Sequence, residues 1–129
     1  MSTKLNQEAV RLIEGKNLAF LAVVLPDGSP HVTPVWIDHE GDVVLVNTAM
    51  GRVKQRNTTK GKRVSLAISA YNDMYDRITI QGRVIDQTHE GADAHIDKLA
   101  NKYTGAKRYE RSSPTEKRVI IKIEPIRIF

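Results

Sequence analysis

Short segments of alternating apolar residues, joined by tight turns, dominate this chain of 129 residues. Residues 17–25 (NLAFLAVVL) are apolar on both alternating faces, which predicts a strand covered on both sides. A turn at 26–30 leads to a second expected strand at 31–38, and a turn at 39–42 leads to a third at 43–47. The spacing therefore predicts a meander of three antiparallel strands.

The later part of the chain continues this alternation. Strands are expected at 64–70 and 77–84, and Gly82 inside the second one predicts a bulge or a close backbone approach. In the tail, residues 119–128, the apolar phase changes at the Glu-Pro pair 124–125. Because proline removes a hydrogen-bond donor from the ladder, we expect a bulge or a sheet edge there.

Helical periodicity is confined to three segments, residues 3–14, 50–58 and 89–104. Helices between the strands are too few for a parallel, doubly wound sheet. The pattern predicts a mainly β (α+β) fold, with one domain over residues 1–129. We expect this domain to be a small closed antiparallel barrel with helices at its margins.

Composition and motif content exclude several classes of function. No cysteine is present, so disulfides, thiolate catalysis and thiolate-bound metal centres are excluded. Glycine-rich nucleotide loops and the serine-nucleophile elbow are absent, and the four histidines lack metal-ligand spacing, so no metal site is expected. No apolar run reaches membrane-spanning length and no apolar signal core is found near the amino terminus, so we expect a cytoplasmic protein without membrane contact.

The positive charge of the chain is concentrated in residues 51–63 (GRVKQRNTTKGKR). This segment holds six lysines and arginines and no acid, whereas the rest of the chain holds 14 basic and 15 acidic residues. Such a block is typical either of a solvated helix and loop or of an anion site. Nucleic acid is the less favoured partner, because the segment has no aromatic residue to stack on bases.

The junction between the third expected strand and the basic segment is the best candidate for an anion site. Thr48 is a candidate N-cap, and free N–H groups at the start of a helix attract phosphate. Arg52, Lys54 and Arg56 place cations where a helix dipole favours anions. Arg52 and Arg56 would share one helical face, and Asn57 lies three residues beyond Lys54. The pattern predicts a phosphate cradle without a glycine-rich loop.

The second expected strand carries two residues that are typical of a ligand site. Pro34 has no N–H group, so it belongs at a sheet edge or beside an opening. Trp36, the single tryptophan, shares its face and is a candidate wall for a planar ligand, although a core or dimer-interface position fits the pattern equally well. Tyr75 and Arg77, which precede the long strand, are candidates for stacking or charge.

Taken in order, these segments resemble the pyridoxamine-5′-phosphate-oxidase-like split β-barrel flavoproteins, and more narrowly the small enzymes that use the deazaflavin coenzyme F420. The resemblance covers nearly the whole chain and is carried by FLAVVLPDGSPHVTPVW, VLVNTAMGRVKQRN, GKRVSLAI, ITIQGRVI and RVIIKIEPIRI. Its most specific element is T-x-x-x-R-x-K-x-x-N, from Thr48 to Asn57. The resemblance implies a split antiparallel β-barrel with flanking helices.

The same resemblance implies a homodimer with the cofactor in a groove between the subunits. It implies that Arg52 and Lys54, with Arg56 and Asn57, hold the phosphate-bearing tail of the cofactor. The other positions that it implies for the cofactor are Thr33, Pro34, Val35, Trp36, Val46, Asn47 and Thr48 around the ring system, and Tyr75 and Arg77 from the partner subunit.

The implied function is hydride transfer between F420 and a small organic acceptor, in an oxidoreductase whose catalytic residues the sequence does not identify. The family also contains members that bind FMN or haem, so FMN is an alternative cofactor. A non-catalytic carrier of F420 or flavin is an alternative role. The chain lacks a recognisable carboxy-terminal substrate-binding segment, which argues against pyridoxamine-phosphate oxidation itself.

Overall fold

The computed structural model describes residues 2–129. The helices are α1 (Gln7–Glu14), α2 (Val53–Arg56) and α3 (Ala92–Thr104), and the strands are β1 (Ala19–Val24), β2 (Pro30–Val35), β3 (Ile37–Glu40), β4 (Val43–Ala49), β5 (Arg63–Ala70), β6 (Asp73–Thr88) and β7 (Arg118–Ile128). Within these residues the strands form one antiparallel sheet in the order β2-β1-β5-β6-β7-β4-β3. None of the helices in this range is long and apolar enough to cross a bilayer.

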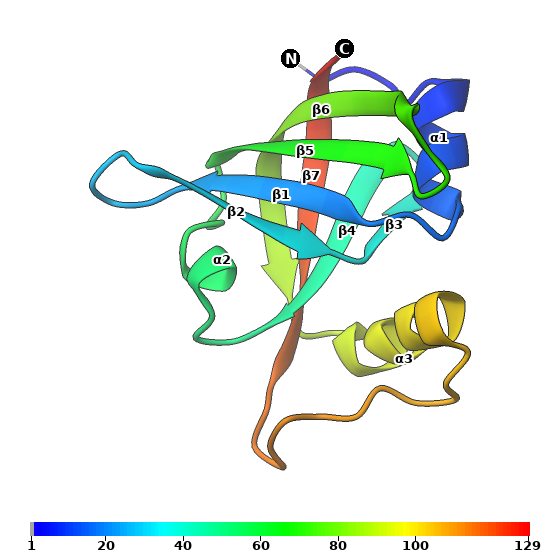
Figure 1. The fold of residues 1–129 in the computed structure, drawn as a ribbon. Coiled ribbons are helices and arrows are strands. Elements are labelled where there is room, and N and C mark those ends of the chain that lie inside the picture. The colour runs from blue at the N-terminus through cyan, green and yellow to red at the C-terminus, as the bar shows by residue number, and fades with distance from the viewer. Residues whose placement is uncertain (1) are drawn as a thin grey trace.

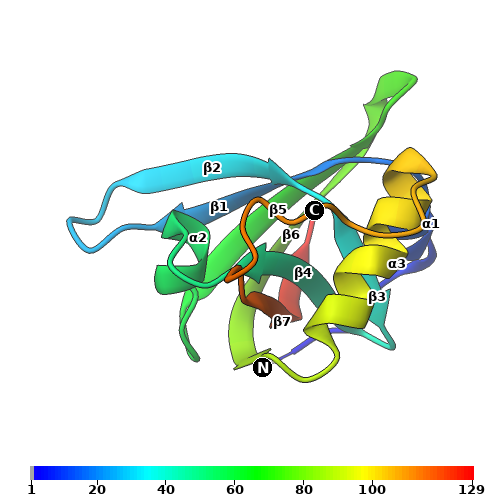
Figure 2. The same cartoon turned by 90° about the horizontal axis from the view of Figure 1, so that it is seen from below.

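The sheet curls around its core with the helices at its margins, so the expected mainly β split barrel is confirmed (Figures 1 and 2). The expectation of full closure is wrong, because β2 and β3 end the sheet on opposite sides. The interior is filled by the inward-facing residues of the strands, such as Leu21, Leu66, Ile80 and Ile121. Burial of these side chains supplies most of the driving force for folding.

The expected strand at 31–38 is broken at Trp36 into β2 and β3. The β2 strand pairs with β1, whereas β3 pairs with β4 at the other edge of the sheet. The expected three-stranded meander is therefore two hairpins, joined by a chain that passes from one edge to the other at Trp36. The two alternating sets of side chains continue through Trp36 in the sequence. The change of pairing partner at this residue could therefore not be predicted from the pattern.

Two helices attach to the barrel in different ways. The α1 helix begins at Asn6, whose side chain accepts from the Ala9 N–H at 2.8 Å, and it buries Leu12 and Ile13 in the core. The α3 helix is held at its carboxyl end by Tyr103, whose hydroxyl donates to the Asn17 carbonyl at 2.6 Å. Both helices are shorter at their amino ends than the expected 3–14 and 89–104.

Gly82 and Pro125 lie opposite one another in the β6–β7 ladder. A Cβ on Gly82 would come within 2.6 Å of Ile123 Cγ2 and 2.7 Å of the Glu124 carbonyl oxygen, so the expected close approach is confirmed. The register shifts between Gln81 and Gly82, as expected for a bulge near Pro125. The β4 ladder ends at Ile123, so Pro125 pairs with β6 alone and the expected sheet edge is also present at this point.

The outer face of β1 is exposed, contrary to the expectation of a strand covered on both sides. Phe20 and Val24 are 46% and 50% exposed, and Val32 on the neighbouring β2 is 61% exposed. Phe20 lies opposite Pro34 on one side and opposite Ala67 on the other, so these residues share one face. The described chain therefore has an apolar sheet face that none of its own elements covers.

Candidate cofactor site

A cavity of about 310 Å³ opens where the ends of β2 and β4 meet α3 and the loop that follows it. Its aromatic, apolar and cationic walls come from segments that are far apart in the sequence. The residues that line it are Leu18, Pro34, Val35, Trp36, Asn47, Thr48, Arg52, Lys54, Ile96, Tyr109 and Arg118. Seven of these residues were expected at a cofactor site from the sequence: Pro34, Val35, Trp36, Asn47, Thr48, Arg52 and Lys54.

The other expected residues lie elsewhere in the described chain. Thr33 is on β2, one residue before the cavity wall, and Val46 is fully buried in the core. Arg56 is exposed, and the Asn57 amide donates to the Val53 carbonyl at 2.8 Å. Tyr75 and Arg77 lie on the exposed amino-terminal part of β6, where the Arg77 guanidinium lies 5.7 Å from the Tyr75 ring centroid.

The expected helix over 50–58 is a single turn, Val53–Arg56, that begins at Arg52. Thr48 is not its N-cap, because Thr48 belongs to β4 and pairs with Val119 of β7. Gly51 has a φ of +88°, and its N–H donates to the Gln55 side chain at 2.9 Å. This left-handed turn delays the helix, so the dipole of a long helix does not act on the cavity. The positive potential comes from side chains instead.

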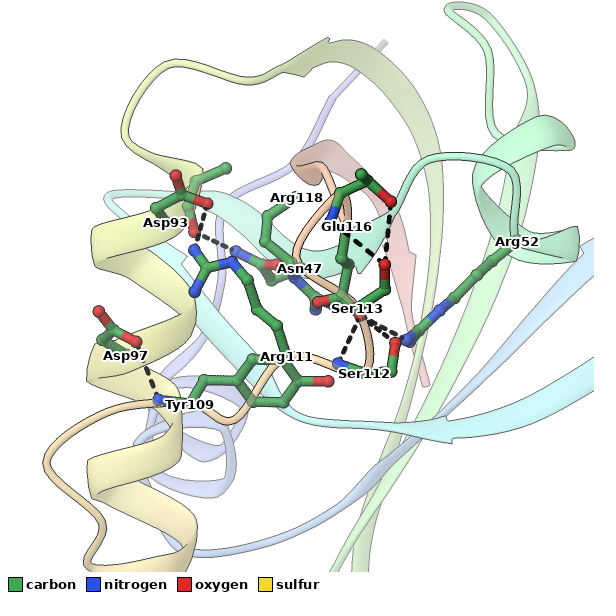
Figure 3. Close-up of polar contacts among 12 residues, drawn as sticks. Asn47, Arg52, Asp93, Asp97, Tyr109, Arg111, Ser112, Ser113, Glu116 and Arg118 are labelled. Carbon is green, nitrogen blue, oxygen red and sulfur yellow. Dashed lines mark hydrogen bonds and ion pairs between the residues drawn. The ribbon is translucent and has the colours of Figure 1, made fainter.

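Arg118 is the cationic residue that sequence reasoning missed. It begins β7 and is 3% exposed. Its Nη1 donates to Glu116 Oε2 at 3.1 Å, and Arg52 Nη2 approaches Glu116 Oε1 at 3.5 Å (Figure 3). Glu116 therefore bridges two arginines that lie 66 positions apart in the chain. Arg118 gave no sequence signal because it lies outside the basic segment and begins an ordinary apolar strand.

Lys54 shows that the cavity has unbalanced positive charge. Burial and the neighbouring charges of Arg52 and Arg118 lower the pKa of Lys54 below its usual value. Glu116 compensates only part of this charge. Burial alone would raise the pKa of Glu116. Hydrogen bonds from Ser112 and Arg118 outweigh this effect and hold the pKa below its usual value. Three cations and one carboxylate leave an excess of two positive charges among these four side chains, which suits an anion.

The buried hydroxyl of Thr48 is a second feature, besides the excess positive charge, that is typical of a ligand site. The residue is 1% exposed, and its Oγ1 is buried without a hydrogen-bond partner in the described chain. A buried hydroxyl without a partner costs free energy of about 1–3 kcal/mol. Because Thr48 lines the cavity, a polar ligand atom there would satisfy it. The donors, the cations and the adjacent aromatic wall together fit a cofactor that carries both a ring system and a phosphate.

The aromatic wall consists of Trp36 and Tyr109. Their rings meet edge to face, with centroids 6.2 Å apart and an interplanar angle of 87°. Tyr109 belongs to the loop between α3 and β7, and its N–H donates to Asp97 on α3 at 2.9 Å (Figure 3). The Arg118 guanidinium lies 4.8 Å from the Tyr109 ring centroid. This loop therefore contributes both an aromatic wall and, through Glu116, a partner for the arginines.

A curled antiparallel sheet with a cationic, aromatic-walled cavity at its open side defines a split β-barrel protein. The model of the pyridoxamine 5′-phosphate oxidase family matches residues 5–129. The chain belongs to this family.

Two relatives are similar over nearly their whole length. An F420H(2)-dependent biliverdin reductase of Mycobacterium tuberculosis (strain CDC 1551 / Oshkosh) is 26% identical over 130 residues, which cover 98% of this chain and 88% of the relative. A solved structure described as an F420 reductase is 25% identical with a TM-score of 0.80, covering 97% of this chain and 98% of the other.

A third comparison supports the fold alone. The crystal structure of a putative pyridoxamine 5′-phosphate oxidase from Lactobacillus delbrueckii is 17% identical, with a TM-score of 0.67, and the match covers 98% of this chain and 93% of the other. This protein and the Lactobacillus protein thus share one architecture, although their residues differ at more than four-fifths of the compared positions.

Proposed function

We propose that this protein is an F420-dependent oxidoreductase that acts on a small organic acceptor. The observation that carries the proposal is the convergence of Arg52, Lys54 and Arg118 beside Trp36 in one cavity. The relatives described as F420-dependent biliverdin reductase and F420 reductase support the choice of deazaflavin. When bound, this cofactor would supply the hydride chemistry, and the protein would supply binding, orientation and exclusion of water.

The cations of the cavity would hold the phosphate of the cofactor. Arg52 and Arg118 present guanidinium groups, which suit oxyanions because their N–H donors form a fixed fork. Lys54 adds a charge that is destabilised without a counter-ion. Pro34, Val35 and Trp36 would flank the ring system, and the Thr48 hydroxyl would find a partner in its polar edge.

We also propose that the protein acts as a homodimer through the outer face of β1 and β2. This face exposes Phe20, Val24 and Val32, and it continues to Pro34 at the rim of the cavity. Arg77 lines a shallow hollow on the same face, next to Phe20. Pairing of two such faces would bury the apolar residues and bring Arg77 toward a second subunit.

A parallel titration of the purified protein with F420, FMN and haem tests the choice of cofactor. Absorbance and fluorescence should show F420 binding with a dissociation constant of about 1 μM or tighter, weaker binding of FMN, and no binding of haem. FMN binding as tight as that of F420 would overturn the deazaflavin assignment and favour an FMN enzyme of the same family.

Turnover separates an enzyme from a carrier. The protein loaded with reduced F420 should oxidise it when small acceptors with activated C=C or C=N bonds are added, as followed by stopped-flow absorbance. Tight binding of F420 without oxidation by any acceptor would instead show a carrier that binds the cofactor without catalysis.

A further inference from the structure

The side chain of Asn47 lies in the cavity wall, but its amide is occupied by protein groups on both sides. Its Oδ1 accepts from Arg118 Nε at 3.0 Å. Its Nδ2 lies 2.9 Å from the Ala92 carbonyl oxygen and 3.0 Å from His95 Nδ1. Asn47 therefore contacts both the buried arginine of the anion site and a histidine of α3.

Two of these partners fix the orientation of the Asn47 amide. Arg118 Nε always carries a hydrogen, so the group facing it must be the acceptor Oδ1. The Ala92 carbonyl can only accept, so the group facing it must be the donor Nδ2. The second hydrogen of this NH₂ group points to His95 Nδ1, and that ring nitrogen must accept it.

The tautomer of His95 follows from this orientation. With a lone pair on Nδ1, the neutral ring carries its hydrogen on Nε2, which lies 3.0 Å from Asp38 Oδ2. Lys98 Nζ donates to the same carboxylate oxygen at 3.1 Å. The negative charge of Asp38 is thus matched by Lys98 and by a neutral N–H donor, without a histidinium ion. A continuous hydrogen-bonded chain runs from Lys98 to Arg118.

We propose that Asn47 and His95 are positioning residues, which hold the Arg118 guanidinium toward the cavity as long as His95 is in the neutral, Nε2-protonated tautomer. The proposal rests on the proposed function only in assigning Arg118 to the bound anion. A second hydrogen on His95 Nδ1 would oppose the Asn47 NH₂ group, donor against donor. This repulsion would push the amide away from its place between Ala92 and Arg118, and it would weaken the acceptor contact that orients the Arg118 guanidinium.

A second hollow, of about 660 Å³, lies on the far side of His95. Asp38 and Lys98 place one negative and one positive charge beside the His95 ring in this hollow. The remaining charged or titratable side chains of this hollow are His39, Glu40, Glu90 and Lys122. His95 is 9% exposed and lines this hollow, whereas it does not line the candidate cofactor cavity.

Nuclear magnetic resonance tests the arrangement without any cofactor. At pH 7 the ¹⁵N shifts of His95 should show an unprotonated Nδ1 and a protonated Nε2, and the Arg118 Nε–H should exchange slowly. In Asn47→Ala the Arg118 Nε–H should exchange faster, and His95 should no longer be restricted to the Nε2-protonated tautomer. A His95 ring protonated on Nδ1 in the wild type, or an Arg118 N–H unchanged in Asn47→Ala, would overturn the proposal.

Binding of F420 gives the functional readout. Affinity should fall about tenfold in His95→Ala, as expected for the loss of orientation at one charge-assisted contact. It should also fall in the wild type as His95 becomes protonated, whereas His95→Gln, which can accept from Asn47 and donate to Asp38, should bind with less pH dependence. His31→Gln is the matched control, because His31 lies on β2 and lines neither this hollow nor the candidate cofactor cavity.

The two proposals fail in distinguishable ways. If F420 does not bind at all, the proposed function fails while the His95 tautomer still stands. If F420 binds but His95→Ala, His95→Gln and the wild type share one affinity and one pH profile, the positioning role is wrong and the cofactor assignment survives.

Discussion

The indole of Trp36 stacks on the ring of Tyr103, with centroids 5.3 Å apart and planes inclined by 6°. The Tyr103 hydroxyl is fixed in turn, because it donates to the Asn17 carbonyl at 2.6 Å and accepts from the Ile37 N–H at 3.2 Å. Trp36 is therefore held in place before any ligand arrives. A wall that is already ordered spares the entropy of ordering it on binding.

Trp36 should report the arrival of the cofactor. It is the single tryptophan, and it lines the candidate cavity. We expect its emission to fall in a saturable manner as F420 is added, with the same midpoint as the absorbance titration. Trp36→Phe should remove the signal while retaining stacking on Tyr103. Saturable binding by absorbance with unchanged tryptophan emission would place the ligand away from this cavity.

Lys54→Met should separate stability from binding. Removing an ammonium group that is desolvated and repelled by Arg52 and Arg118 should raise Tm in the absence of ligand. The same change should weaken F420 binding by about 5–150-fold, through loss of a charge-assisted contact worth about 1–3 kcal/mol. Lys60→Met, on the exposed loop, is the control and should alter neither quantity. Unchanged affinity in Lys54→Met would remove this residue from the site.

Asp38 should give the protein a stability that is lost in acid. Burial alone would raise the pKa of Asp38. Hydrogen bonds from His95, the His39 N–H and Lys98 outweigh this effect and hold the pKa well below its usual range. A lowered folded-state pKa stabilises the fold above the unfolded value of about 4, and this contribution is lost as the pH falls below it.

Urea unfolding of wild type and Asp38→Asn from pH 7 to pH 3 measures this contribution. The variant should be less stable at pH 7, and the difference should shrink toward pH 3. Asp86→Asn, on the exposed surface of β6, serves as the control. A difference that stays constant with pH would show that Asp38 acts through packing alone.

Val32→Glu should disrupt the proposed dimer. A carboxylate on the apolar face would be buried without a partner when two faces meet, which costs several kcal/mol. Light scattering after size exclusion should show a dimer for the wild type and a monomer for the variant. Met50→Glu adds the same charge at an exposed apolar residue in the turn after β4, away from this face, and should remain dimeric. A monomeric wild type would contradict the proposal directly.

The fold was predictable where local chemistry sets the backbone. Gly82 and Pro125 each disturb a strand in a way that depends on the residue itself, so their sequence positions predicted the irregular pairing that they form together. The break at Trp36 was not predictable in this way. It depends on which strands β2 and β3 pair with, and those partners lie at opposite edges of the sheet.

The site was predictable only in the part that is contiguous in the chain. Arg52 and Lys54 belong to the basic segment 51–63, whose charge pattern predicts an anion site. Arg118 and Tyr109 reach the same cavity from the loop and strand that follow α3. Nothing near Arg118 in the sequence indicates that its guanidinium meets Asn47, 71 positions earlier. Such contacts follow from the sheet order, which alternation alone does not specify.

The central position of β7 has a consequence for synthesis on the ribosome. It joins β6 to β4, although it is the last strand in chain order. Until β7 has emerged, the β2-β1-β5-β6 part of the sheet shares no strand with the β4-β3 hairpin. Arg118, at the start of β7, is added to the anion cavity at the same late stage. Cofactor capture must therefore follow translation of this strand, and it cannot guide the earlier steps of folding.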